Sequence, residues 1–325
     1  MEGARTRALV RATQGGTAFD HIDAVLRSVP QYREFLEGKL SRQGYSDWME
    51  TCGGRLFGDR LNEDQRNLST RIRVDDRQYV AELLEDLRGA GICASTVYPE
   101  EAFDDYRDRV ASDTDHSGRV TYIFPEEARL LFALAHVLRP KRAAFLGSYY
   151  GYWASWALPG IAAAGGRATL VDIDPAVMAI AERNLAALGM ARHVEFVVAD
   201  AIEMAPRRLR NVDLCVLDAE GPKQGADPDL LDKAIYYPIM RAATPAIRPG
   251  GVLVVHNMLL ENLTANRYFE RSVERNRRQF VKFMRHLDEH YDRRRVYSTT
   301  EGVGAYRRNV ETEQGWSREG TSCVA

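Results

Sequence analysis

The segment that most constrains the fold of this chain is a short apolar run that leads into a turn containing two glycines. Residues 143–146 read Ala-Ala-Phe-Leu, and the turn reads Gly147-Ser-Tyr-Tyr-Gly151. A second apolar run, residues 168–172, ends on Asp172. A strand, a glycine turn, a helix and a strand ending in a carboxylate are typical of a nucleoside-binding half-site. Glycine lets the backbone approach a ligand, and the carboxylate accepts hydrogen bonds from two ribose hydroxyls.

The spacing of the glycines argues against a dinucleotide site. Such a site carries Gly-x-Gly-x-x-Gly, because a pyrophosphate must lie on the helix N-terminus. Here Ser148, Tyr149 and Tyr150 fill the turn and leave no room for a diphosphate. The pattern favours a ligand with a nucleoside and no phosphates, of which S-adenosylmethionine (SAM) is the common one. Taken alone, the two glycines are also compatible with a plain strand-to-helix turn.

Composition indicates an ordinary globular enzyme. The net charge of −2 does not indicate binding to nucleic acid or to an anionic membrane surface, both of which attract basic proteins. No segment approaches the roughly 18 apolar residues of a membrane span, and we expect a cytoplasmic protein. The four cysteines form no C-x-x-C pair, which favours reduced thiols over a zinc site or a disulfide framework.

The chain divides by pattern into three parts. Residues 1–120 are predicted to form a helical, charged extension that acts as a cap, as a dimerisation surface or as both. Residues 121–309 alternate between helical and strand patterns, and residues 310–325 are expected to be a flexible tail. After the first strand, further strands are predicted at 168–172, 194–199, 212–217 and 251–256, with helices such as 176–188 and 229–244 between them. A long helix over 267–291 and a hairpin of 295–299 and 302–308 complete a doubly wound, mainly parallel sheet whose terminal hairpin is antiparallel.

Several local motifs in this second part are similar to those of one enzyme family. They are Pro125-Glu126, Lys141-Arg142, the turn GSYYGYWA, the sequence VDIDP, Ala199-Asp200-Ala201 and the closing hairpin. In these features the chain resembles the class I SAM-dependent methyltransferases, and more narrowly their catechol and caffeoyl-CoA O-methyltransferase-like branch. The resemblance covers about residues 121–308 and implies an α/β, Rossmann-like methyltransferase sheet behind an N-terminal helical extension.

The resemblance implies a set of SAM-binding residues. Gly147 and Gly151 would pass under the methionine part, Ser148 would bind its carboxylate, and Asp172 would hold the ribose. The remaining expected contacts are Ile173 and Asp200 with Ala201 at the adenine, Tyr149 as an aromatic neighbour of the sulfonium, and Asp218. Asp200 also fits a helix N-cap. The family's acid two residues before the first glycine is replaced by Phe145, so that the contact it makes is absent or supplied elsewhere.

The carboxyl ends of strands four and five carry the candidate catalytic groups, since ligands in such sheets bind beyond these ends. Asp218 follows strand four, and His256-Asn257 follows strand five. Metal-dependent members of the branch hold a divalent ion with an Asp and an Asp-Asn pair at these places. His256 replaces one Asp, which weakens the case for magnesium. We predict His256 as general base, oriented by Asp218 or Glu220. A metal site of Asp218, His256 and Asn257, or a structural histidine, stays open.

These features together predict a SAM-dependent enzyme that methylates a hydroxyl of a small molecule, with a secondary metabolite as the expected acceptor. Glu220, Tyr236, Tyr237 and Asn257 are the candidate acceptor contacts, and a homodimer is expected. The alternatives are N-methylation of an amine, a non-enzymatic SAM-binding protein and, from another class, a nucleotide-dependent oxidoreductase. The missing phosphate turn and the terminal hairpin count against the last of these.

Overall fold

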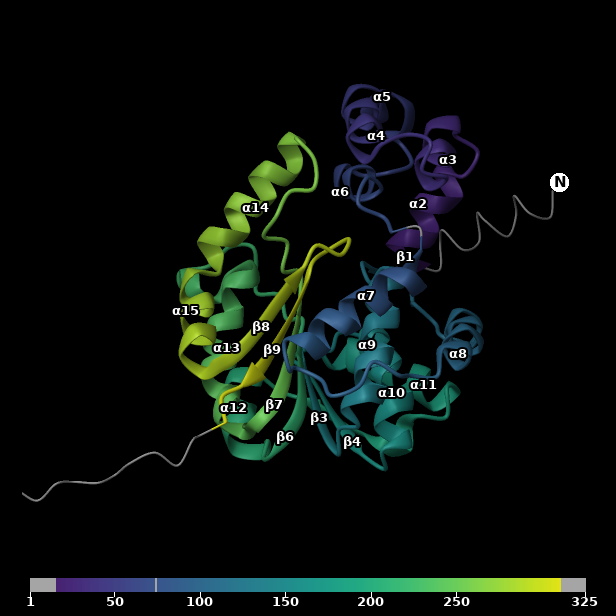
Figure 1. Cartoon of the computed structure of the whole chain (residues 1–325). Coiled ribbons are helices and arrows are strands. Elements are labelled where there is room, and N and C mark those ends of the chain that lie inside the picture. The colour runs from purple at the N-terminus through teal and green to yellow at the C-terminus, as the bar shows by residue number, and fades with distance from the viewer. Residues whose placement is uncertain (1–15, 74, 311–325) are drawn as a thin grey trace, which may run out of the picture.

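In the computed structural model, which describes residues 16–73 and 75–310, seven strands form one sheet in the order β5-β4-β3-β6-β7-β9-β8 (Figure 1). Their bounds are β3 Arg142–Leu146, β4 Arg167–Asp172, β5 Val194–Val198, β6 Val212–Leu217, β7 Ile247–His256, β8 Tyr291–Tyr297 and β9 Val303–Arg308. The strands β3 to β7 pair in parallel, and β9 is antiparallel to both of its neighbours. The predicted parallel sheet with a reversed terminal strand is therefore confirmed.

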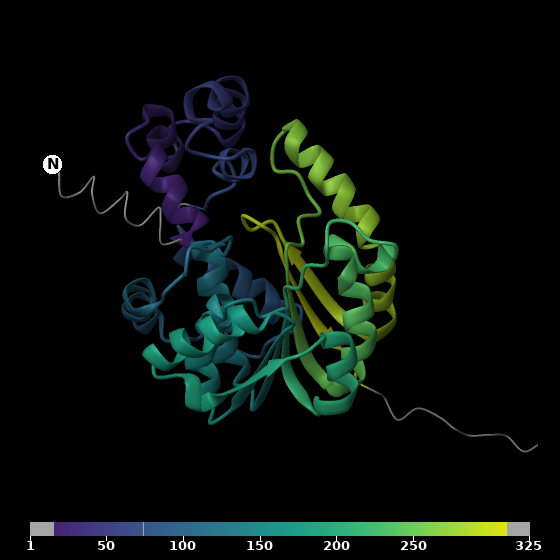
Figure 2. The same cartoon turned by 180° about the vertical axis from the view of Figure 1, so that it is seen from behind.

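Helices cover both faces of this sheet (Figures 1 and 2). One face carries α7 Asp76–Gly89, α8 Glu100–Asp113, α9 Pro125–Leu138, α10 Tyr152–Ala163 and α11 Pro175–Ala187; the other carries α12 Ala201–Arg208, α13 Tyr236–Ala243 and α15 Val281–His290. Along β3, Ala143 and Phe145 pack into the hydrophobic cluster under α9 and α10. Ala144 and Leu146 pack into the cluster on the opposite face, under α12 and α13. This alternation follows from the two-residue period of a strand, and it explains why β3 is apolar throughout.

The first helices of the chain form a separate cluster at one end of the sheet. They are α2 Ala18–Leu26, α3 Pro30–Leu36, α4 Arg42–Trp48, α5 Gly54–Phe57 and α6 Glu63–Leu68, with β1 Gly16–Thr17 paired to β2 Val120–Thr121. Their buried aromatic core also contains Leu259 and Phe269, the latter from α14 Arg267–Gln279. The helices α7 and α8 instead share the hydrophobic cluster of the sheet. The boundary near residue 120 stays a prediction, and the tail beyond residue 310 lies outside the described residues.

Two predicted helices differ in the structure. The helix expected over 267–291 is broken at Phe280, whose ring is fully buried and stacks on Tyr236 with centroids 5.5 Å apart. The break turns this ring into the core, and β8 begins already at Tyr291. The helix expected over 229–244 begins only at Tyr236, after the short 3₁₀ turns η3 Pro228–Leu230 and η4 Asp232–Ile235. Asp232 has a φ of 48°, which no right-handed helix accommodates.

Two further sequence expectations can be compared with the described residues. Cys52, Cys93 and Cys215 are free thiols there, and Cys215 is a fully buried strand residue. None of the helices in the described part has the length and apolar character that a bilayer crossing demands.

Candidate active site

The glycine turn follows β3 at the carboxyl edge of the sheet, and its geometry requires glycine. Gly147 has a φ of 75°, and a Cβ atom placed there would lie 2.4 Å from the Cα of Ala219. Gly151 has a φ of 77° and is the N-cap residue of α10. Both positions therefore reject a larger residue on backbone grounds, and the turn presses directly against the residue that follows Asp218.

Asp172 ends β4 beside this turn and is held by backbone amides. One carboxylate oxygen accepts a hydrogen bond from the Tyr149 amide at 2.8 Å, and the other accepts one from the Asp174 amide at 3.1 Å. Burial raises the pKa of this carboxyl above its ordinary value. The next side chain, Ile173, is 71% exposed and offers an open apolar surface next to the acid. This is the arrangement that a ribose and an adjoining adenine require, although the individual contacts stay predictions.

The remaining cofactor candidates differ in accessibility. Asp200 caps α12, since its carboxylate accepts from the Ile202 amide at 2.8 Å, and it also lines the cavity with Ala201. The predicted helix cap is therefore present, and the contact with the adenine stays a prediction. The Ser148 hydroxyl is buried and has no hydrogen-bond partner among the described residues. Phe145 is buried in the hydrophobic cluster beneath α9 and α10, so that an aromatic ring fills the place of the family's acid.

A single cavity of about 1450 Å³ joins this cofactor side to a polar cluster farther along the sheet edge. On the first side it is lined by Gly147, Tyr149, Asp172, Ile173, Asp200 and Ala201, and on the second by Asp218, Glu220, Lys233, His256, Asn257 and Glu301. Residues of α6 and α14 complete its wall, among them Leu68 and Tyr268. We call the first set the cofactor half and the second the acceptor half.

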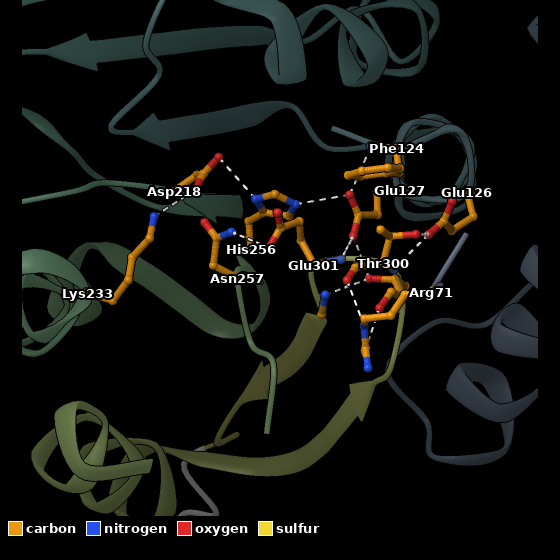
Figure 3. A network of polar contacts seen from close by, with 12 residues as sticks. Arg71, Phe124, Glu126, Glu127, Asp218, Lys233, His256, Asn257, Thr300 and Glu301 are labelled. Atoms are coloured by element: carbon orange, nitrogen blue, oxygen red, sulfur yellow. Dashed lines mark hydrogen bonds and ion pairs between the residues drawn. The ribbon is translucent and has the colours of Figure 1, made fainter. Parts of the chain in front are cut away.

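His256 ends β7 in the middle of the acceptor half, between two carboxylates (Figure 3). Its Nε2 lies 3.1 Å from Oε2 of Glu127, and its Nδ1 lies 3.3 Å from Oδ2 of Asp218. Burial alone would lower the pKa of this imidazole, but the two carboxylates outweigh burial and raise the pKa to about 10. Burial would likewise raise the pKa of Asp218, and the His256 and Lys233 cations hold it below its ordinary value.

These contacts bear on the predicted role of His256 as a base. The imidazole is 2% exposed, both ring nitrogens face carboxylates, and its ring packs against that of Trp153 at a centroid distance of 4.8 Å. A protonated imidazole has no lone pair with which to accept a proton. The arrangement therefore favours a histidine that orients Asp218 and Glu127, and the role of general base stays a prediction without support from the geometry.

Glu127 connects this histidine to the hairpin between β8 and β9. Its Oε1 accepts hydrogen bonds from the Thr299 hydroxyl at 2.6 Å and from the Glu301 amide at 2.8 Å, and its Oε2 accepts from the Phe124 amide at 3.0 Å. Together with the contact to His256, this fully buried carboxylate has four polar neighbours, about as many as a carboxylate has lone-pair sites. The Glu127 carboxylate fixes the hairpin tip to the start of α9.

The neighbouring acid and one arginine of the N-terminal part complete the network (Figure 3). Glu126 accepts from the amide and the hydroxyl of Thr300 at 2.8 and 2.6 Å, and its pKa is raised to about 7 by burial and by Glu127. Arg71 is 1% exposed and donates to the carbonyls of Thr299 and Thr300, both at 2.9 Å. The sequence reasoning did not assign roles to these residues. Two acids at the start of an apolar helix indicate first-turn capping, and nothing local reveals a partner more than 100 residues away.

Lys233 is a further residue to which the sequence pattern assigns no role. Its ammonium lies 3.3 Å from Oδ1 of Asp218 and 3.0 Å from the carbonyl of Ala219. Because Oδ2 of Asp218 faces His256, both oxygens of this carboxylate already face a cationic side chain. Asn257 donates its amide to Glu301 at 3.3 Å.

These contacts test the predicted metal alternative. Within residues 16–73 and 75–310, no three His, Cys, Asp or Glu side chains form a group that could hold a metal ion. The side chains of Asp218, His256 and Asn257 do not fit a divalent ion as they stand, because Lys233 and His256 already face the two oxygens of Asp218.

The structure brings together only part of the predicted acceptor residues. Glu220 and Asn257 line the cavity next to Asp218, whereas Tyr236 and Tyr237 do not. Tyr236 is fully buried, and its hydroxyl donates to the backbone carbonyl of His256 at 3.0 Å. Tyr237 packs edge-on to His286 of α15. The two tyrosines thus differ from the prediction, because Tyr236 lies in the core and Tyr237 packs against His286.

A comparison with known families agrees with this geometry. A family model described as a methyltransferase domain matches residues 144–258, the segment from β3 through Asn257 that carries the glycine turn, Asp172 and Asp218. Together with the sheet order and its reversed last strand, this match confirms the predicted class. Residues 144–258 of this chain thus match a methyltransferase domain.

Individual relatives are more distant. A catechol O-methyltransferase of Niastella koreensis is 26% identical over 144 residues, which are 42% of this chain and 58% of that protein. The chain thus spans less than two thirds of this relative. An O-methyltransferase of Bacillus cereus in complex with SAH is 15% identical, with 74% of this chain and 100% of that chain covered and a TM-score of 0.45. For the O-methyltransferase TomG of Streptomyces achromogenes the corresponding values are 18%, 72%, 99% and 0.42. The class assignment does not rest on these superpositions.

Proposed function

We propose that this chain transfers the methyl group of SAM to a hydroxyl group of a small molecule. The observation that carries the proposal is the continuous cavity, which has the nucleoside-binding turn on one side and a charged polar cluster on the other. The sulfonium methyl is already activated. In-line placement of an acceptor oxygen therefore supplies most of the acceleration, and the cavity can hold donor and acceptor together.

In this proposal the cofactor half binds SAM through the predicted residues. Asp172, oriented by two backbone amides, accepts from the ribose hydroxyls, and Ile173 lies against the adenine. Asp200 and Ala201 lie at the other edge of the base. Gly147 and Gly151 leave room for the methionine part, and the buried Ser148 hydroxyl is available to its carboxylate.

The acceptor half receives the hydroxyl. In the reaction the acceptor oxygen forms a bond to the methyl carbon, the carbon–sulfur bond breaks with its electrons on sulfur, and the hydroxyl proton leaves to solvent. His256 orients Asp218 in this step, because the contacts on both of its nitrogens support a positioning residue better than a base. Oxygen is preferred to nitrogen as acceptor because the matched relative is named a catechol O-methyltransferase. An acceptor from secondary metabolism, a homodimer and a cytoplasmic location stay predictions.

The test is a binding and transfer experiment with the full chain. SAM should raise the melting temperature and NAD should not. With methyl-labelled SAM, a hydroxyl of catechol should then be labelled more than the amine of 2-aminoethylphenol. Asp172→Ala should lower SAM affinity by about 100-fold, because two hydrogen bonds to a charged acceptor are lost. A protein stabilised by NAD and indifferent to SAM would contradict the proposal, and exclusive labelling of amines would replace it with N-methylation.

A further inference from the structure

Lys233 is held in a fixed place by its own loop. The loop from Gly221 to Asp232 closes on itself through hydrogen bonds from the Gly221 amide to the Asp232 carbonyl and from the Asp232 amide to the Pro222 carbonyl. The side chain of Asp232 accepts from Lys223 at 3.0 Å and from Gln279 at 3.2 Å. Lys233, the next residue, is 12% exposed. Its ammonium is thus positioned before any ligand binds, which reduces the entropy lost when it makes a further contact.

The ammonium also lies beside the position expected for the methyl donor. It donates to the carbonyl of Ala219, and Ala219 is the residue against which Gly147 packs without room for a Cβ atom. The glycine turn that is proposed to pass under the methionine part of SAM and the Lys233 ammonium therefore both contact Ala219. Figure 3 shows the lysine reaching Asp218 from the side opposite His256.

The hydrogen bonds of this ammonium are incomplete. An ammonium has three N–H donors, and two of them are used by Asp218 and Ala219. The nearest oxygen of Glu220 is 4.0 Å away, beyond hydrogen-bonding distance. In the described part of the chain the third donor has no hydrogen-bond partner, and Lys233 lines the cavity. A divalent ion on Asp218 would have to displace this cation.

We propose that the Lys233 ammonium, rather than a divalent ion, is the positive charge that binds the acceptor oxygen during methyl transfer. This inference rests on the proposed function and extends it to the class of acceptor. The third N–H donates to the acceptor oxygen and stabilises its anion. The hydroxyl proton passes to water, the oxygen lone pair forms the bond to the methyl carbon, and the sulfonium becomes a thioether.

A single ammonium suits only a moderately acidic hydroxyl. A phenol ionises near pH 10, close to the ordinary value of a lysine, whereas water and simple alcohols are far weaker acids, with a pKa of about 15.7 for water. One charge–charge contact at the edge of a cavity can lower the pKa of a phenol into the neutral range. It cannot lower the pKa of an aliphatic alcohol that far. The acceptor class is therefore a phenol or catechol, and not an aliphatic alcohol.

The experiment measures the ionisation of a bound phenol without relying on turnover. Full-length protein is treated with EDTA, saturated with SAH and titrated with 4-nitrocatechol, whose anion is coloured. The wild type should lower the pKa of the bound probe by about one unit, a tenfold change in its proton affinity. Lys233→Met should abolish this shift and reduce turnover of catechol by about 100-fold. Lys233→Arg should keep a part of the shift.

The control is Lys282→Met, which removes another lysine that contacts this loop, since Lys282 pairs with the half-buried Asp229 at 2.5 Å. It should leave the shift unchanged, and SAH binding by each variant reports that the protein is folded. A shift that appears only after magnesium is added, or that persists in Lys233→Met, overturns the inference. So does an unshifted probe on a wild type that binds SAH and transfers methyl groups, and this leaves the proposed function intact. A wild type that binds neither SAM nor SAH overturns both.

Discussion

The two halves of the cavity are built in different ways. The cofactor half is shaped mainly by the backbone, because two glycines with positive φ form the turn and two amides hold the carboxylate of Asp172. In the acceptor half, side chains hold one another. His256 is fixed by Glu127 from 129 residues away, and Glu127 holds a hairpin that lies more than 170 residues farther along the chain. A local fold element can therefore define a cofactor site, whereas the acceptor site needs the whole tertiary structure.

The difference also extends to charge. Asp172 accepts hydrogen bonds from uncharged backbone amides, whereas in the acceptor half Lys233, Asp218 and His256, with Glu127 behind them, alternate as cation and anion. Removal of one member of such a buried chain leaves its neighbours without a partner. Substitutions in the two halves should consequently have separate signatures, one in SAM affinity and the other in turnover and stability.

The largest expected effect is in the cofactor half. Gly147→Ala should abolish measurable SAM binding, because the new Cβ would lie 2.4 Å from the Ala219 backbone and φ is 75°. Calorimetric titration with SAM measures it. Gly89→Ala is the matched control, since a Cβ there meets nothing within 4 Å. Full SAM affinity in Gly147→Ala would show that the turn is not the cofactor site.

The next effect tests the independence of the halves. His256→Ala should lower turnover by about 100-fold and the free energy of unfolding by about 3 kcal/mol, because two buried carboxylates lose their shared cation. SAM affinity should change less than about threefold, since no cofactor-half residue touches the imidazole. His256→Asn, which can still donate a hydrogen bond, should lose less stability. If His256→Ala weakens SAM binding as much as turnover, the two halves are one energetic unit.

A smaller effect is expected where the N-terminal helices meet the hairpin. Arg71→Met should lower the free energy of unfolding by about 2 kcal/mol, because the Thr299 and Thr300 carbonyls lose a charged donor. It should raise KM for the acceptor and leave SAM affinity unchanged. The control Arg27→Met breaks a surface ion pair that is 76% exposed at the arginine, and it should cost less than about 0.5 kcal/mol. An Arg71→Met protein with unchanged stability and KM would separate the extension from the acceptor half.

The smallest effect is a dependence of stability on pH. The pKa of His256 rises from 6.5 to about 10 on folding, so that its contribution is complete below pH 6.5 and is lost as the pH rises toward 10. Burial raises the pKa of Glu301 from 4.5 to about 7. The stability that its protonated form contributes is therefore lost as the pH rises from 4.5 to 7. The melting temperature should therefore fall from pH 5 to pH 9, and His256→Asn should flatten the part above pH 7. A melting temperature that rises over this interval would contradict the charged imidazole.

The sequence predicts the cofactor half more fully than the acceptor half, for a physical reason. The glycines, the acid-ended strand and Asp200 lie within about sixty residues and follow rules of local geometry. The sheet with its reversed strand is predicted by the same rules. Lys233 and Glu127 give no local signal, because a lysine in a turn and an acid in a first helical turn are most often solvated. Tyr236 is predicted at the cavity, but its ring is buried against Phe280 and Phe283, which lie more than 40 residues farther along the chain and give no local signal.

The bonds from Glu126, Glu127 and Arg71 to the hairpin tip have a consequence for the order of assembly. As a ribosome releases the chain, the strands β3 to β5 and the glycine turn are available to pair early. The acceptor half gains Thr299 to Glu301 only when nearly all of the chain has emerged. Contacts of such long sequence separation form late in folding. A truncated chain that lacks the hairpin would thus keep the turn that shapes one ligand site and lose the scaffold of the other.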